Sequence, residues 1–104
     1  MSSEHDLQNG ILDYLHLKKI YCWRNNSGAF KKDNYFIRFG KKGSADILGI
    51  LPDGRFLAIE CKAKGKYPTP EQEEFLQAIK QNNGVAILAR SLDDVLRFIP
   101  PTFK

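Results

Sequence analysis

The sequence predicts an α/β fold in which helices flank a mixed β-sheet. Three observations lead to this prediction: an apolar helical repeat near the start, a strand–turn–strand segment in the middle, and a second helix followed by one more strand. A hairpin followed by a helix and a further strand combines antiparallel and parallel neighbours in one sheet, and helices must then cover its faces. The chain of 104 residues suits a single domain, residues 1–104.

Two longer helices are expected, and each has a recognisable start. Ser3 and Asp6 fit a capping box at the start of the first helix, whose apolar residues recur every three or four positions. Thr69 can cap the second helix, with Pro70 at its first position. A short final helix is expected over residues 91–99, because two prolines follow it directly.

The strands are indicated by runs of β-branched and aromatic residues. Such runs cover residues 20–25, 35–39, 45–51, 55–63 and 85–89. Pro52-Asp53-Gly54 has the residue types of a tight turn and joins two of these runs into a hairpin. The last run is almost continuously apolar, which is typical of a strand buried on both faces. We expect residues 25–34 to form a polar loop and residues 40–44 a basic, glycine-rich one.

Composition and charge exclude several classes of protein. Sixteen basic and twelve acidic residues give a net charge of +4, which weakly favours a polyanionic partner. We expect no membrane span and no signal peptide, because the chain lacks a long apolar run and its first residues lack an apolar core. Cys22 and Cys61 have no metal or redox spacing, so we expect both thiols in the core of a reduced, cytoplasmic protein.

The most informative pattern lies in the predicted hairpin. Side chains alternate along a strand, so Glu60 and Lys62 share one face and Cys61 points to the other. The hairpin can bring Asp46 level with Glu60, because both lie away from the turn. Two carboxylates on an interior strand repel each other, and a divalent cation such as Mg²⁺ or Mn²⁺ is the usual remedy. A neighbouring lysine can then assist an attacking water or neutralise charge on a phosphoryl group.

A structural alternative remains open for this pattern. Glu60 and Lys62 could form an ion pair at the edge of a sheet, with Asp46 as a turn residue. The flanking basic loops and the positive net charge favour the metal site.

The segments Gly43-Ser44-Ala45-Asp46 and Ile59-Glu60-Cys61-Lys62 resemble the motif of the PD-(D/E)XK nuclease superfamily, and the whole chain resembles its VRR-NUC family, in the minimal stand-alone form from phages and bacteria. The resemblance runs from the first helix to about Leu88. It rests on the segments Arg24-Asn25-Asn26-Ser27-Gly28, Gly43-Ser44-Ala45-Asp46, Ile59-Glu60-Cys61-Lys62 and Gln72-x-x-Phe75. Ala45 departs from the family pattern, which has a proline before the aspartate.

The resemblance implies a restriction-endonuclease-like fold and phosphodiester cleavage that depends on Mg²⁺ or Mn²⁺. By position, Asp46, Glu60 and the backbone carbonyl of Cys61 would hold the metal, and Lys62 would be the catalytic lysine. Gln72 matches a glutamine that lines the site, and Glu4 matches an acidic residue that can approach the metal. Stand-alone members resemble dimeric Holliday-junction resolvases.

Three of these residues also have plain structural interpretations. Gln72 stands where it would complete a capping box with Thr69. The carboxylate of Glu4 would be favoured at a helix N-terminus by the macrodipole alone, by roughly 0.3–1 kcal/mol. Ser44 could bond a phosphate or could be an ordinary loop serine.

Several basic and polar residues precede Asp46 and are candidates for contacts with DNA phosphates. The full set of expected DNA-binding residues is Arg24, Asn26, Ser27, Lys31, Lys32, Arg38, Lys41, Lys42 and Ser44. Tyr35, Phe36 and Phe39 interleave with them and are interpreted as core or dimer contacts.

The function expected from the sequence is a metal-dependent, structure-specific DNA endonuclease. Its substrate would be a four-way junction, cut by a homodimer. Flapped, nicked or plain duplex DNA is the alternative substrate, and a non-catalytic DNA-binding module of the same fold is the alternative function.

Overall fold

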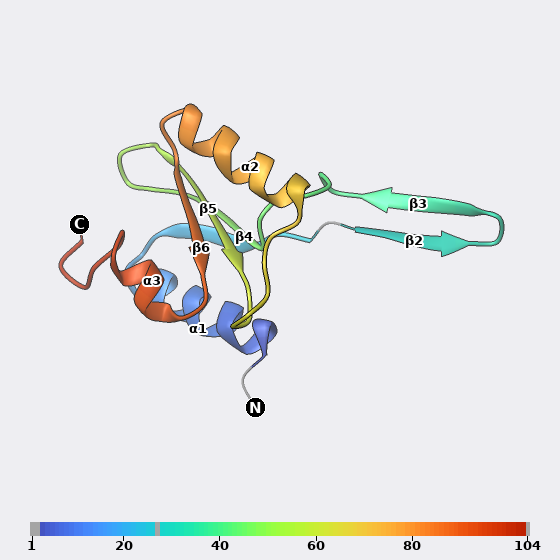
Figure 1. Ribbon diagram of the computed structural model, residues 1–104. Coiled ribbons are helices and arrows are strands. Elements are labelled where there is room, and N and C mark those ends of the chain that lie inside the picture. Colours follow the sequence, from blue (N-terminus) through green and yellow to red (C-terminus); the bar gives the residue numbers. More distant parts are fainter. Residues whose placement is uncertain (1–2, 27, 104) are drawn as a thin grey trace.

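The computed structural model describes residues 3–26 and 28–103, except for the side chain of Phe30. Figure 1 shows the arrangement of its elements. In chain order they are α1 (Glu4–Leu17), β1 (Tyr21–Arg24), β2 (Gly28–Lys32), β3 (Tyr35–Phe39), β4 (Ile47–Ile50), β5 (Phe56–Cys61), α2 (Pro70–Gln81), β6 (Val85–Ala89) and α3 (Leu92–Leu96).

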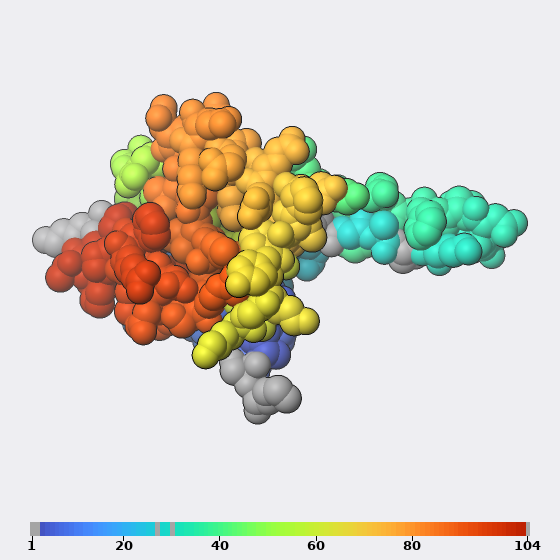
Figure 2. Space-filling view, viewed as in Figure 1, coloured from blue at the N-terminus to red at the C-terminus, as the bar shows by residue number. Residues whose placement is uncertain are grey.

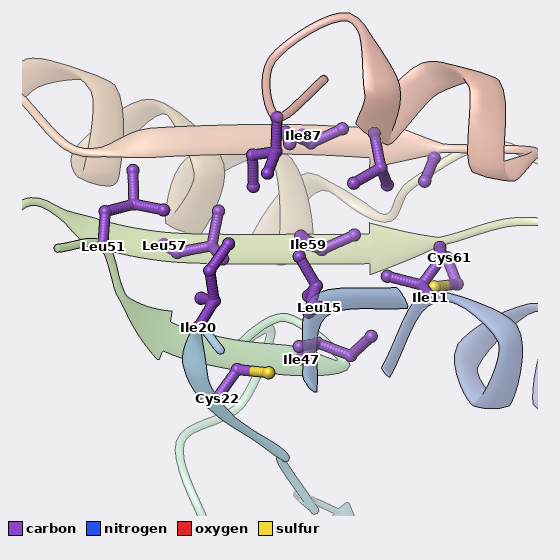
Figure 3. Close-up of a cluster of buried hydrophobic side chains, with 13 residues drawn as sticks. Ile11, Leu15, Ile20, Cys22, Ile47, Leu51, Leu57, Ile59, Cys61 and Ile87 are labelled. Carbon is purple, nitrogen blue, oxygen red and sulfur yellow. The ribbon is translucent and has the colours of Figure 1, made fainter. Parts of the chain in front are cut away.

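A four-stranded mixed sheet forms the body of the protein, as the sequence predicts. Its strand order is β1-β4-β5-β6, with antiparallel pairs except for β5 and β6, which run parallel. The larger core packs α1 and α3 on one face of this sheet, where Ile11, Leu15, Ile59 and Ile87 are buried (Figure 3). The smaller core packs α2 on the other face, around Leu76.

The two longer helices begin as predicted. The hydroxyl of Ser3 accepts a hydrogen bond from the backbone N–H of Asp6, whose carboxylate in turn accepts one from the N–H of Ser3. Thr69 and Gln72 make the same reciprocal pair at the start of α2, with Pro70 at its first position. Both capping boxes satisfy backbone N–H groups that a helix end leaves unpaired.

The central hairpin also matches its prediction. The N–H of Gly54 donates to the carbonyl oxygen of Leu51 at 2.8 Å, and Gly54 has a φ of +92°, which favours glycine. The register pairs Ile47 with Ile59 and Gly49 with Leu57. A Cβ atom on Gly49 would lie 2.6 Å from the carbonyl oxygen of Tyr21, so β1 can pair closely with β4 only because this position is glycine.

One expected loop is a strand instead. Residues 28–32, predicted to lie in a polar loop, form β2, which pairs with β3 in a separate two-stranded sheet. Asp33 and Asn34 make the two-residue turn, and Asp33 adopts a φ of 56°, which suits a hairpin turn of this length. We call residues 28–39 the arm, because it projects from the body of the protein (Figures 1 and 2).

The last helix is shorter than predicted. It covers Leu92–Leu96 rather than residues 91–99, and the side chain of Ser91 makes no capping hydrogen bond. The carboxylate of Asp94 instead accepts a hydrogen bond from the backbone N–H of Arg90 at 2.8 Å. In the part of the chain that the structure describes, no helix is both long and apolar enough to cross a membrane.

Candidate active site

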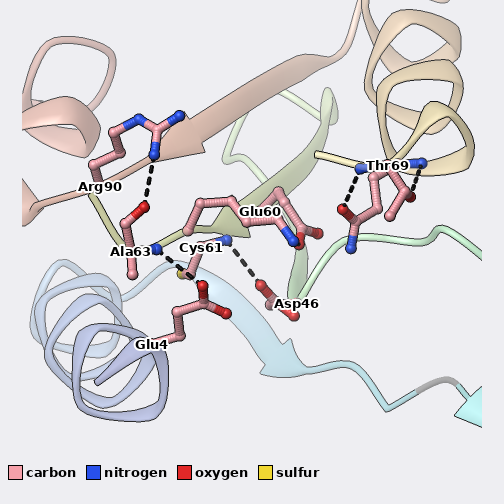
Figure 4. A network of polar contacts seen from close by, with 9 residues as sticks. Glu4, Asp46, Glu60, Cys61, Ala63, Thr69 and Arg90 are labelled. Carbon is pink, nitrogen blue, oxygen red and sulfur yellow. Dashed lines mark hydrogen bonds and ion pairs between the residues drawn. The ribbon is translucent and has the colours of Figure 1, made fainter. Parts of the chain in front are cut away.

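Two acidic side chains meet at one end of the central strands. Ile47 pairs with Ile59, so the residue before β4, Asp46, lies opposite Glu60 on β5. The backbone N–H of Cys61 donates to Oδ2 of Asp46 at 2.8 Å, which fixes this carboxylate against the strand (Figure 4). Glu60 is only 2% exposed. The predicted juxtaposition of the two carboxylates is therefore present.

The side chain of Lys62 lies on the same face of the chain as that of Glu60. Its Nζ atom lies 3.8 Å from Oε2 of Glu60, and its side chain is 15% exposed. The ion pair considered as a structural alternative thus exists, but it lies beside an interior strand rather than at a sheet edge. The other oxygen, Oε1 of Glu60, is buried and has no hydrogen-bond partner among the described residues. The lysine therefore compensates the buried carboxylate incompletely.

Burial controls the protonation of both carboxyl groups. Loss of hydration, followed by the neighbouring charge of Asp46, raises the pKa of Glu60 from its ordinary 4.5 to about 8, against the opposing effect of Lys62. Burial also raises the pKa of Asp46, although the N–H of Cys61 acts in the opposite direction. A pair of carboxyl groups that resists full ionisation is the arrangement that a cation would relieve.

Glu4 reaches the same region from the first turn of α1. Its Oε2 accepts a hydrogen bond from the backbone N–H of Ala63 at 2.9 Å. Its negative charge also raises the pKa of both Asp46 and Glu60. The side chain is therefore bound to the segment that carries Lys62, whatever the helix dipole contributes.

The donor set fits a hard divalent cation with an incomplete protein shell. Among residues 3–26 and 28–103, no three histidine, cysteine or acidic side chains converge closely enough to hold a metal ion. Mg²⁺ commonly takes only one or two carboxylates and keeps waters or substrate phosphates as its other ligands. Asp46 and Glu60, with the unpartnered Oε1, match that pattern. The carbonyl of Cys61 and the carboxylate of Glu4 stay predictions as further ligands.

Gln72 has the capping role that its position allows, and it also faces a hollow. Its side-chain oxygen Oε1 accepts a hydrogen bond from the backbone N–H of Thr69 at 2.9 Å. The same residue lines a pocket between the start of α2 and the base of the arm, together with Arg38 and Lys42. The structural role is present, and a role in the reaction stays a prediction.

The expected DNA-binding residues fall into distinct groups. Lys31, Lys32 and Arg38 are exposed on the arm, and Lys41 and Lys42 are exposed at its base. The nitrogen of Lys42 lies 3.8 Å from Oε2 of Glu71. Strand pairing places Lys31 and Arg38 on one face of the arm and Lys32 on the other.

Of the remaining predicted contacts, two are engaged within the protein, one is exposed and one lies outside the described residues. Ser44 is buried, and its hydroxyl donates to the carbonyl of Lys41 and accepts from Asn25. Arg24 donates to Gln8 and Asn9 on α1. Asn26 is exposed, and Ser27 lies outside the described residues.

Arg90 and Asn25 support the site and were missed by the sequence analysis. Arg90 donates from Nη1 to the carbonyl oxygen of Ala63 at 2.8 Å, beside the Glu4 contact (Figure 4). Asn25 donates to the carbonyl of Ala45, directly before Asp46. Both contacts join segments far apart in the chain. Asn25 lies in a segment that carries the family resemblance, but no local pattern in the sequence indicated the partners of either residue. The thiols of Cys22 and Cys61 are buried, as predicted, and burial raises the pKa of Cys61 to about 12.

Comparison with known proteins gives one local similarity. No profile of a known protein family matches the chain. A segment of 37 residues is 46% identical to a protein named "Putative nuclease p44" of Acyrthosiphon pisum secondary endosymbiont phage 1. The similarity covers 36% of this chain and 40% of that phage protein.

Proposed function

We propose that the protein is a metal-dependent DNA endonuclease with a PD-(D/E)XK-type site, and that it belongs with the stand-alone VRR-NUC nucleases. The single observation that carries this proposal is the close placement of Asp46, directly before β4, and the buried Glu60 on the adjacent strand β5, with Lys62 beside them. A protein that only bound DNA would gain nothing from holding two carboxylates together where a phosphate must approach. The local similarity to a phage protein named as a nuclease supports the same activity.

Asp46 and Glu60 are the residues that would hold Mg²⁺ or Mn²⁺. The cation would supply Lewis acidity toward the phosphodiester and its attacking water. The N–H of Cys61 keeps the carboxylate of Asp46 in one orientation, at 2.8 Å, so this ligand is positioned before any cation binds. Glu60 is held by its place on an interior strand.

Lys62 would act on the reacting phosphate. Its side chain is mostly buried and its ammonium nitrogen lies close to Glu60, so the position of this group is restricted. There it can orient the attacking water or neutralise the charge that develops on the phosphoryl oxygens. No covalent intermediate with the protein is required.

The preferred substrate in this proposal is branched DNA, in particular a four-way junction cut by a homodimer. One active site makes one nick, whereas resolving a junction takes two nicks related by symmetry. A two-fold dimer provides two such sites. Exposed aromatic side chains on the arm, including Tyr35 and Phe36, support an interface with another chain. Flapped, nicked or plain duplex DNA stays the alternative substrate.

The test is to incubate the pure protein with four-way junction, flap and linear duplex DNA, each with EDTA, Mg²⁺ or Mn²⁺. We expect cleavage only with a divalent cation, and faster cleavage of the junction than of the duplex. The Asp46→Asn variant is the control for a contaminating nuclease. Cleavage that persists in EDTA would overturn the metal mechanism.

The dimer is tested separately by light scattering at micromolar concentration, with and without junction DNA. We expect twice the mass of one chain. A protein that stays monomeric on the junction would exclude paired cleavage by a dimer and favour the flap or nick as the substrate.

A further inference from the structure

The loop that follows Lys62 carries an unusual aromatic side chain. This loop, residues 64–67, consists of Lys64, Gly65, Lys66 and Tyr67. Tyr67 is 76% exposed, and Arg90 lies over its ring, with Cζ 5.2 Å from the ring centroid. One face of the ring is thus backed by a guanidinium group, an arrangement that holds an aromatic ring in place.

The backbone of this loop is fixed next to the candidate active site. The carbonyl oxygen of Ala63 accepts hydrogen bonds from the N–H of Lys66 at 3.0 Å and from Nη1 of Arg90 at 2.8 Å. The N–H of Ala63 donates to Glu4, whose charge acts on Asp46 and Glu60. Arg90, whose contact with Ala63 is drawn in Figure 4, also lies over the ring of Tyr67 and therefore joins that ring to the segment that carries Lys62.

The charges around the ring favour an anionic chain. Lys64 and Lys66 are exposed on the loop, which lies on the surface in Figure 2 in yellow. A hollow beside it is lined by Glu4, Ala63, Lys64 and Arg90. Among the residues that line this hollow, Glu4 is the single carboxylate, against the cationic groups of Lys64 and Arg90, and Lys66 adds a further positive charge on the loop.

We propose that Tyr67 is a stacking platform for an unpaired base of the DNA next to the cleaved phosphate, with Lys64 and Lys66 contacting the flanking phosphates. This inference rests on the proposed function. An exposed aromatic ring beside basic side chains is the common way to bind single-stranded nucleic acid without reading its sequence. Bases inside a duplex are covered on both faces by their neighbours, so only an unpaired base can stack on the ring. The platform therefore adds affinity for DNA that has an unpaired nucleotide at the cutting site. A flap has such a nucleotide and a fully paired four-way junction does not, so the platform favours the flap, the alternative substrate of the proposed function.

The experiment measures DNA binding in the Asp46→Asn background without metal, where DNA is not cut and one repelling carboxylate is neutral. The parent and its Tyr67→Ala, Tyr67→Phe and Tyr21→Ala derivatives are compared on a flap and on a fully paired duplex. Tyr21 is a matched control, because it is an exposed tyrosine paired with Ile50 at the opposite end of β4 from Asp46.

We expect Tyr67→Ala to weaken flap binding about tenfold and duplex binding less than about twofold. Tyr67→Phe keeps the ring and should bind as the parent does, as should Tyr21→Ala. A 2-aminopurine base at the first unpaired position should be quenched by the parent and by Tyr67→Phe but not by Tyr67→Ala. Thermal unfolding of each variant checks that it is folded.

The failures of the two proposals are distinguishable. Equal binding of the flap by the parent and by folded Tyr67→Ala, or equal losses on flap and duplex, would overturn the platform alone. If the wild-type protein cleaves none of the DNAs and the parent binds none, the proposed function fails, and the platform fails with it.

Discussion

The carboxylate end of the central strands and the arm are built in opposite ways. Glu60 lies in a sheet with helices on both faces and is almost completely buried, and Asp46 directly precedes β4 of the same sheet. The arm is a two-stranded sheet by itself, and Phe36 near its tip is 70% exposed. A pair of strands without further packing is marginally stable in water. The difference indicates two separate roles. The body holds its acidic groups largely shielded from water, whereas the arm presents solvent-exposed basic groups away from the body.

The largest expected effect comes from the carboxylates. Asp46→Asn and Glu60→Gln should each remove detectable cleavage, because either change takes away a ligand for the cation. DNA binding by Asp46→Asn should be unchanged or tighter, since a negative charge facing the phosphates is lost. Single-turnover cleavage and filter binding of the same preparations separate the two outcomes. Cleavage by Asp46→Asn at the wild-type rate would show that the chemistry lies elsewhere.

The carboxylate site could be predicted from the sequence because its geometry follows from local rules. Strand alternation places Glu60 and Lys62 on one face, and the Pro52–Gly54 turn sets the register that brings Asp46 opposite Glu60. The two capping boxes are equally local, since each needs residues only three positions apart. Structural features that depend on residues close together in the chain could therefore be predicted from the sequence.

The arm and the supports of the site could not be predicted in this way. Residues 28–32 include glycine and two lysines, a composition that resembles a loop, and β2 forms because Asp33-Asn34 allows it to pair with β3. The contact of Arg90 with Ala63 depends on the parallel pairing of β5 with β6, which brings together segments 27 positions apart. Whether Ser44 turns inward depends on Asn25, which is 19 positions away.

Lys62 should show the next largest effect. Lys62→Ala should lower the single-turnover rate by about 10²-fold, a typical loss when a group that stabilises developing charge is removed. The free energy of unfolding should change little, because the ion pair with Glu60 is long, at 3.8 Å. Lys80→Ala, at an exposed lysine in the last turn of α2, is the matched control and should keep most of the rate. A folded Lys62→Ala protein with the wild-type rate would instead support the purely structural ion pair.

The buried carboxyl group predicts a dependence of stability on pH that the exposed arm cannot share. In the unfolded chain Glu60 releases its proton near pH 4.5, whereas in the folded protein it keeps the proton until about pH 8. The folded state therefore binds more protons between these values, and the free energy of unfolding should fall as pH rises through this window. Since one unit of pKa shift corresponds to about 1.4 kcal/mol, the free energy of unfolding should fall by several kcal/mol at most across this window.

The measurement is urea unfolding in EDTA at pH 5 and pH 8. Glu60→Gln should remove most of the difference, and Asp13→Asn, an exposed carboxylate on α1, should leave it unchanged. Saturating Mg²⁺ or Mn²⁺ should restore stability at pH 8, because a cation favours the ionised carboxylates. A wild-type stability that rises from pH 5 to pH 8 in EDTA would contradict the assigned protonation of Glu60.

The smallest expected effect on stability is the removal of the arm, which sharpens the comparison directly. Replacing residues 28–39 by a short glycine–serine linker should shift the melting temperature by less than about 2 °C. Of the residues that the structure describes, none from the arm belongs to either buried core. Shortening the connection between β1 and β4 also lowers the entropy lost on folding slightly.

DNA binding should respond differently to removal of the arm, because Lys31, Lys32 and Arg38 are removed with it. The slope of log affinity against log salt should decrease by about two to three, since each phosphate that the protein no longer neutralises lowers the slope by about one. An arm whose removal unfolds the protein would show that it is part of the body, and an unchanged salt dependence would show that its charges do not bind DNA.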